Sequence, residues 1–193
     1  MGDQLRAAVD RSERLIDGLL LLARSERRPE EWRAVDLAAA AVDAIDAVRA
    51  EAGADGVRVD HQLGEAVARG DPALLERAVS NLVENAVRHN WRGGWVLVTT
   101  STEQGRARVT VSNTGPDVGD GEVEALFEPF RRADRDRTGS QRGAGLGLSI
   151  VRAVAEAHGG EVRARPRSGG GLEVELRLPG GAPFGDVARG DRS

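Results

Sequence analysis

The stretch GDPALLERAVSNLVENAVRHN, residues 70–90, decides the fold because it predicts the best-defined helix of the chain. Asp71 can accept hydrogen bonds from the free amides of a first helical turn, and Pro72 already has the φ angle that this turn needs. Apolar residues then recur every three or four positions, which predicts a buried stripe along the helix. The stripe consists of Leu75, Ala78, Leu82 and Ala86.

A second face of this helix is polar and carries Asn81, Asn85, Arg88 and His89. Asparagine is a poor helix former, so helix propensity does not account for two of them here. Amide oxygens are hard, neutral ligands suited to a magnesium ion that also holds phosphates, and an arginine one turn later can bind a phosphate. The pattern predicts a magnesium-phosphate site, although a solvated polar face would have the same spacing.

Two glycine-containing segments can approach a ligand closely. The first, NTGPD (113–117), follows a predicted strand, and its Asn113 offers the acceptor and donors that would read an exocyclic amine and a ring nitrogen. An ordinary tight turn would look the same. The second, GAGLGLSI (143–150), precedes a predicted helix, so its backbone amides can converge on an anion at the helix N-terminus, unless it is only a flexible loop. Its alternating glycines are Gly143, Gly145 and Gly147.

Composition excludes several classes of protein. The 193 residues contain no cysteine, carry a net charge of −4, and have arginine at all 27 basic positions. These facts exclude a disulfide scaffold and a Walker A loop, and they argue against nucleic-acid binding. The longest apolar run, Leu19 to Ala23, is too short to span a bilayer and no signal peptide opens the chain, so we expect a soluble chain.

The remaining elements predict an α+β fold, a two-layer sandwich of a mixed β-sheet with helices on one face. Asp36 begins a helix to about Ala52, with Leu37, Val42, Ile45 and Val48 facing inward. A short helix at 122–127 and a long charged segment at 131–144 precede a helix at 146–158. Strands are predicted at 57–63, 95–101, 106–112, 161–164 and 172–178.

The N-terminal segment from Gln4 to Arg24 is helical in pattern and has a heptad seam with additional leucines. Such a helix packs either on its own domain or in a bundle whose other helices lie elsewhere, and we favour the bundle. Pro29 marks a hinge. The predicted organisation is one isolated bundle helix (1–28), a hinge (29–34), a globular domain (35–179) and a disordered tail (180–193).

Four ordered motifs resemble those of one known family. SNLVENAVRHN, VSNTGPDV, LFEPFRR and GAGLGLSIV resemble the N, G1, F and G2 boxes of the catalytic ATP-binding domain of sensor histidine kinases in two-component systems. That domain belongs to a superfamily with gyrase, mismatch-repair and heat-shock-chaperone ATPases. The resemblance covers Val35 to Pro179, and the N-terminal helix resembles the second helix of the family's dimerisation bundle.

The resemblance implies a role for each box. Asn81, Asn85 and Arg88 would be the catalytic group, with Asn85 as the Mg2+ ligand and Arg88 on the phosphates. Asn113 would accept from the adenine amine, and Phe127 and Phe130 would anchor a lid at 131–144. The full ATP-binding set is Asn81, Asn85, Arg88, His89, Asn113, Gly115, Phe127, Phe130, Arg131, Gly143, Gly145, Leu146, Gly147 and Leu148.

Three departures from the family pattern matter. Asn113 stands where the family usually has aspartate, which removes a charge from the base contact. Asp117 stands at the second glycine of the G1 box, which puts the conformation of this loop in doubt. Asn81 stands where the related ATPases have a water-activating glutamate, and an amide cannot act as a general base, which favours a kinase over an ATPase.

The expected function is transfer of the ATP γ-phosphoryl group to a histidine, with ATP and Mg2+ as cofactors. None of His61, His89 and His158 resembles the family's acceptor box, so we expect the acceptor on a dimerisation helix that this chain lacks. The implied partners are that helix, a second copy in a full-length homodimer, and a response regulator. The implied location is the cytoplasmic portion of a membrane-anchored sensor. The alternatives are a degenerate nucleotide-binding scaffold and an anti-sigma-type serine kinase.

Overall fold

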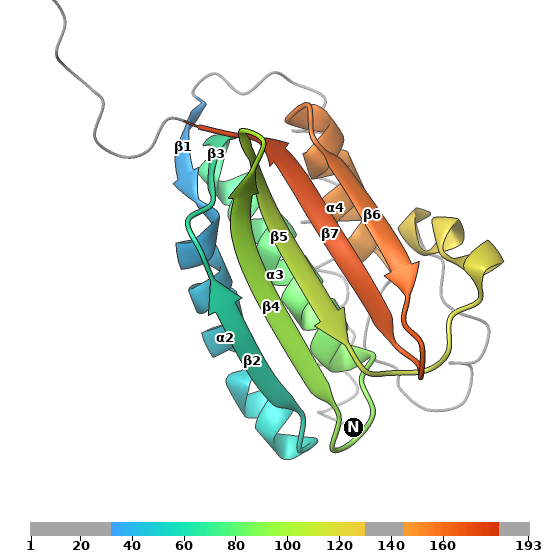
Figure 1. Ribbon diagram of the computed structural model, residues 1–193. Coiled ribbons are helices and arrows are strands. Elements are labelled where there is room, and N and C mark those ends of the chain that lie inside the picture. Colours follow the sequence, from blue (N-terminus) through green and yellow to red (C-terminus); the bar gives the residue numbers. More distant parts are fainter. Residues whose placement is uncertain (1–31, 130–144, 182–193) are drawn as a thin grey trace, which may run out of the picture.

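The computed structural model describes residues 32–129 and 145–181. Its main feature is a five-stranded mixed sheet with the order β2-β4-β5-β7-β6 (Figure 1). β2 pairs in parallel with β4, and the other neighbours are antiparallel. The strands are β2 (Arg58–Leu63), β4 (Trp95–Glu103), β5 (Arg106–Asn113), β6 (Glu161–Pro166) and β7 (Leu172–Pro179).

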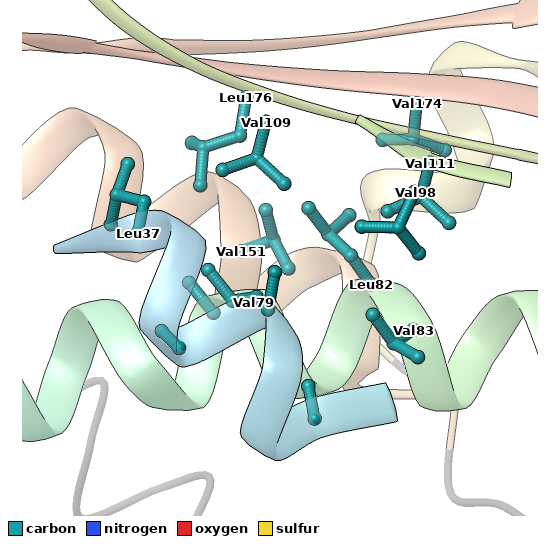
Figure 2. Close-up of a cluster of buried hydrophobic side chains, with 14 of the residues drawn as sticks. Leu37, Val79, Leu82, Val83, Val98, Val109, Val111, Val151, Val174 and Leu176 are labelled. Atoms are coloured by element: carbon teal, nitrogen blue, oxygen red, sulfur yellow. The ribbon is translucent and has the colours of Figure 1, made fainter. Parts of the chain in front are cut away.

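Helices α2 (Leu37–Ala54), α3 (Pro72–Arg88) and α4 (Gly147–Ala157) all cover the same face of this sheet (Figure 1). The core lies between the two layers, where Val79 and Leu82 of α3 and Val151 of α4 meet Val109 and Leu176 of the sheet (Figure 2). All five are at most 2% exposed. The predicted two-layer α+β sandwich with helices on one face is therefore confirmed.

Both predicted helix starts are confirmed at the level of side chains. The Asp36 carboxylate accepts hydrogen bonds from the amides of Ala38 and Ala39 and begins α2. The Asp71 carboxylate accepts from the amide of Leu74 (3.2 Å), and Pro72 occupies the first turn of α3. Each aspartate satisfies amides that have no partner within the helix, so the chain direction at the start of each helix follows from local sequence.

A small second sheet was not predicted. Strand β1 (Arg33–Asp36) pairs antiparallel with β3 (Val67–Gly70), and Ala68 bridges to Gly180 beyond the end of β7. Each strand has only four residues, which is too few for a clear alternation of apolar and polar positions. Arg33 and Ala34 thus lie in a strand that begins within the segment predicted as a hinge.

Two details differ from the sequence prediction. Val42 was expected inside but is 43% exposed, because the buried stripe of α2 runs through positions 37, 40, 41, 44, 45, 48 and 52 and passes it by. The short helix expected at 122–127 is instead two successive 3-10 turns, Asp120–Glu122 and Glu124–Phe127. The Glu122 amide donates to the Gly119 oxygen (2.8 Å), three residues back, which is the hydrogen bond of a 3-10 turn.

Several predicted features lie outside the described residues. These are the N-terminal bundle helix (1–28), the first part of the hinge, the segment 131–144 and most of the tail. Within residues 32–129 and 145–181, no helix has both the length and the apolar composition that a membrane span requires.

Candidate functional site

Helix α3 carries the polar face that the sequence predicted, and this face turns toward the start of α4. Asn81 is buried at 5% exposure, Asn85 and Arg88 are half-buried, and His89 is the exposed C-cap residue of the helix. A Cβ atom placed on Gly147 would lie 3.9 Å from Asn81 Oδ1. The N and G2 boxes are therefore neighbours in space although 66 positions separate Asn81 from Gly147 in the sequence.

Polar atoms on this face have no partner within the described part of the chain. The buried atoms Asn81 Nδ2 and Arg88 Nε make no hydrogen bond. The side chain of Asn85 also makes none with the described residues. An unpaired buried polar group costs about 1–3 kcal/mol, so native proteins seldom keep one without a reason. A ligand that binds here would satisfy these groups.

Arg88 is the cation of the site. Its Nη2 atom lies 3.6 Å from Glu84 Oε2, one turn earlier on α3, and the Arg88 side chain is 20% exposed. Glu84 is shared, because Arg77 Nη1 also lies 3.4 Å from its other oxygen. The long, shared contact leaves the guanidinium fork able to bind an additional anion.

The start of α4 supplies backbone donors beside Asn81. Gly145 has a φ of +69°, a conformation that favours glycine, and the helix begins at Gly147 without any side-chain cap. Leu146 and Leu148 are buried at 5% and 6% exposure, so they fix the first turn against the core. The uncapped first-turn amides and the helix dipole form a site for a phosphate group.

The G1 loop begins at the end of β5, where Asn113 is 5% exposed. Its Nδ2 atom donates to the carbonyl oxygen of Thr114 (2.8 Å), and a carbonyl can only accept, so the contact fixes which way the amide points. No described residue donates to Asn113 Oδ1. This oxygen is therefore an oriented, neutral acceptor.

Gly115 brings this loop against the end of α3. A Cβ atom at position 115 would overlap the main-chain oxygen of His89, so only glycine permits the contact. The doubt about Asp117 is resolved, because among the described non-glycine residues only Gln104 has a positive φ. Aspartate at this position therefore costs the loop no left-handed strain.

The structure brings most of the expected site together. On one side lie Asn81, Asn85, Arg88 and Gly147 at the start of α4, and on the other lie His89, Gly115 and Asn113. Phe127 is 3% exposed, and Arg152 of α4 stacks over its ring at 4.3 Å, so it is an anchor in the core. Phe130, Arg131 and Gly143 lie outside the described residues.

A magnesium ion fits this donor set only with help from a ligand. The described residues contain no group of three or more His, Cys, Asp or Glu side chains that could hold a metal. The uncommitted amide oxygen of Asn85 can supply one hard neutral ligand, which suits an ion that completes its shell with phosphate oxygens and water.

Sequence reasoning missed a group of residues whose contacts support the G1 loop. Thr114 Oγ1 donates to Asn90 Oδ1 (2.6 Å) and accepts from the amide of Trp95 (2.8 Å). Arg167 stacks on the ring of Trp95 with 4.3 Å to its centroid. No local pattern marks these residues, because their partners are distant in the sequence.

Comparison with known proteins agrees with this geometry. Residues 70–182 match the family described as histidine kinase-, DNA gyrase B-, and HSP90-like ATPase. The sensor protein CutS of Streptomyces coelicolor is 54% identical over 180 residues, which is 93% of this chain and 44% of CutS. The sensor protein KdpD of Mycobacterium tuberculosis is 42% identical over 127 residues, which is 65% of this chain and 14% of KdpD. The chain thus spans less than half the length of these relatives.

Solved structures show the same fold. The mycobacterial sensor histidine kinase MprB superposes with a TM-score of 0.68 and 28% identity, covering 78% of this chain and 98% of that one. Full-length ShkA in complex with AMPPNP superposes with a TM-score of 0.76 and 28% identity, covering 92% of this chain and 37% of that one. The chain belongs to the histidine kinase-, DNA gyrase B- and HSP90-like ATPase family, and it contains the ATP-binding catalytic domain of a sensor histidine kinase.

Proposed function

We propose that this domain binds ATP with Mg2+ and transfers the γ-phosphoryl group to a histidine on a dimerisation helix outside this chain, for relay to a response regulator. The observation that carries the proposal is that two buried atoms, Asn81 Nδ2 and Arg88 Nε, have no partner among the described residues and lie on the helix face next to the start of α4. A bound polyphosphate would supply acceptors for both donors.

Each part of the site has a role in this transfer. Asn113 and Gly115 receive the base, the first-turn amides of α4 hold the phosphates, and Arg88 offsets their charge. Asn85 would hold the magnesium ion, which neutralises charge on the phosphates when bound. Phosphoryl transfer depends mainly on such positioning and charge neutralisation, with little covalent chemistry for the protein to perform.

The proposed phosphoryl transfer forms one bond and breaks one bond. An imidazole nitrogen of the acceptor forms a bond to the γ-phosphorus, the bond from this phosphorus to the bridging oxygen breaks, and ADP leaves with the electron pair. The acceptor ring loses its remaining proton to solvent. Asn81 cannot accept a proton from water, so bound ATP waits for the acceptor instead of being hydrolysed.

The histidines of this chain support an acceptor elsewhere. His158 is 1% exposed, with Nε2 accepting from the Asp71 amide (3.1 Å) and Nδ1 within 2.7 Å of the Val154 carbonyl oxygen. His89 caps α3 beside the G1 loop, and His61 lies on the edge strand β2. All three histidines thus lie at a helix end or in a strand, and not inside a helix as the acceptor box of the family does.

We further propose that the full-length protein is a membrane-anchored homodimer with this domain on the cytoplasmic side. The support is the name of sensor protein that relatives such as CutS carry, together with a match that extends over 93% of this chain. The same names favour a sensor kinase over an anti-sigma-type serine kinase, and no observation favours the non-catalytic scaffold.

Radiolabelled ATP tests the transfer. The chain is incubated with labelled ATP and Mg2+ alone, and then with a separately supplied helical hairpin that carries a histidine in the acceptor box of the family. We expect acid-labile label on the hairpin and none on this chain. Label on the chain alone would contradict an external acceptor, and an unlabelled hairpin despite measured ATP binding would contradict the kinase assignment.

A further inference from the structure

The turn between β6 and β7 contacts the loop that would receive the base. Three successive glycines in this turn, Gly169, Gly170 and Gly171, have φ values of +87°, +90° and +92°. The turn is closed by the Arg167 amide donating to the Gly171 oxygen and by the Gly170 amide donating to the Arg167 oxygen, both at 3.1 Å. The Gly171 amide reaches across to the carbonyl oxygen of Pro116 (3.1 Å). The turn therefore forms a bonded support for the G1 loop.

Space at this contact admits only glycine. A Cβ atom on Gly170 would overlap the main-chain oxygen of Gly115 and lie 3.3 Å from Asp117 Oδ1. A Cβ atom on Gly171 would overlap the main-chain oxygen of Asn113. Because the backbones approach this closely, a movement of the turn displaces the G1 loop as well.

Arg167 is the one large side chain of this support. Its Nη1 atom donates to the main-chain oxygen of Asn113 (3.3 Å), and its guanidinium lies over the ring of Trp95. In the described part of the chain no carboxylate pairs with it, unlike Arg163 on the preceding strand β6, which binds Glu161 at 2.9 Å. Arg167 thus directs its charge at a carbonyl and an aromatic face, where its planar fork is favourable.

The other flank of Asn113 is fixed independently. Thr114 is held by Asn90, whose Nδ2 also donates to the main-chain oxygen of Trp95 (2.9 Å). Thr114 is fixed on one side and the Asn113 carbonyl is held by Arg167 on the other, while the Oδ1 atom of Asn113 has no partner among the described residues.

An asparagine at this position carries a risk that an aspartate does not. If its amide turned over, Nδ2 would replace Oδ1 at the site and would donate to a 6-oxo purine instead of accepting from a 6-amino purine. The hydrogen bond from Nδ2 to the Thr114 oxygen opposes this rotation, and it persists only while the main chain of residues 113 and 114 keeps its place.

We propose that Arg167 is a positioning residue that keeps the Asn113 amide in the orientation for a 6-amino purine, and that it thereby sets the preference of the site for ATP over 6-oxo purine nucleotides. This inference rests on the proposed ATP-binding function. Inosine triphosphate is the matched probe, because it differs from ATP in carrying a 6-oxo group, with a protonated ring nitrogen beside it.

The test compares dissociation constants for ATP and inosine triphosphate, measured by calorimetry with Mg2+ on the whole chain. Arg167→Met keeps an apolar side chain on Trp95 but removes the donor to Asn113. We expect the ratio of the dissociation constant for inosine triphosphate to that for ATP to fall by roughly fivefold or more, from weaker ATP binding and stronger inosine triphosphate binding. Arg163→Ala, which removes an exposed ion pair on the neighbouring strand β6, should leave the ratio unchanged.

Further variants separate positioning from a general structural effect. Arg167→Lys keeps the charge without the planar fork and should lower the ratio less, and it carries the test if Arg167→Met does not fold. In an Asn113→Asp background, where no donor can turn into the site, Arg167→Met should give no gain in inosine triphosphate binding. An equal loss for both nucleotides in the Met and Lys variants would overturn the inference. Failure of the unaltered chain to bind either nucleotide would instead overturn the proposed function.

Discussion

Helix α3 has a polar cluster near each end, and the two clusters differ in how their hydrogen bonds are satisfied. At the N-terminal end, the Asp71 carboxylate caps the helix, and the buried His158 accepts from the Asp71 amide while its other ring nitrogen bonds the Val154 oxygen. Toward the C-terminal end, the atoms Asn81 Nδ2 and Arg88 Nε are also buried but have no partner among the described residues.

The difference separates structural residues from ligand-binding ones on the same helix. His158 joins the end of α4 to the start of α3 and stacks on Trp32 with ring centroids 5.5 Å apart, and both of its ring nitrogens have partners within the protein. At Asn81 and Arg88 the protein tolerates an unsatisfied group, whose cost a bound phosphate would remove. Substitutions at the first cluster should therefore affect stability, and those at the second should affect binding.

The largest expected effect is that of Asn85→Ala on nucleotide binding. The variant removes the amide oxygen proposed to hold Mg2+, so we expect the magnesium-dependent part of ATP affinity to fall by about 100-fold or more. Calorimetry with and without magnesium measures it, and Ser80→Ala on the same helix is the matched control. Equal magnesium dependence in Asn85→Ala and the unaltered chain would show that the unsatisfied cluster is not the metal site.

His158→Ala should lower the stability of the protein and leave ATP binding nearly unchanged. It deletes a side chain that is 1% exposed and leaves the Asp71 amide without its acceptor, so the free energy of unfolding should fall by about 2–4 kcal/mol. The dissociation constant for ATP, measured on the folded protein below its transition, should change by less than about threefold. Chemical denaturation gives the first quantity. A loss of ATP binding without a loss of stability would reverse the roles of the two clusters.

Asn81→Leu tests whether the unsatisfied cluster contributes to the stability of the protein. Leucine is similar in size and removes a buried donor that has no partner, so the free energy of unfolding without nucleotide should stay within about 1 kcal/mol of the unaltered value or rise. ATP binding should weaken at the same time. A destabilisation as large as that of His158→Ala, measured by the same denaturation, would mean that Asn81 is a structural residue as well.

The sequence predicted what is local. Caps at Asp36 and Asp71 and a three-or-four-residue apolar period were enough for α2 and α3, and helical spacing was enough to place Asn81, Asn85 and Arg88 on one face. The short strands β1 and β3 were missed because four residues carry no period. The support of the G1 loop was missed because the contact from Arg167 to Asn113 spans 54 residues and the contact from Thr114 to Asn90 spans 24.

Among the variants of the nucleotide site, Asn113→Asp should change ATP affinity the least. The substitution is expected to affect both stability and ligand binding. A carboxylate at a position that is 5% exposed loses hydration and cannot donate to the Thr114 oxygen as Nδ2 does, so the nucleotide-free protein should be destabilised by about 1–2 kcal/mol, with Arg167 nearby to limit the cost. When ATP is bound, the charged acceptor makes a stronger bond to the base amine than the amide does, so affinity should rise about two- to threefold. Thermal unfolding and calorimetry on the same preparation measure both quantities.

Asn90→Asp is the control variant, because it alters a residue that supports the loop without facing the base. It should lower stability without any gain in affinity. Affinity and stability that fall together in Asn113→Asp would show that residue 113 belongs with the satisfied, structural cluster and that its oxygen does not contact the base.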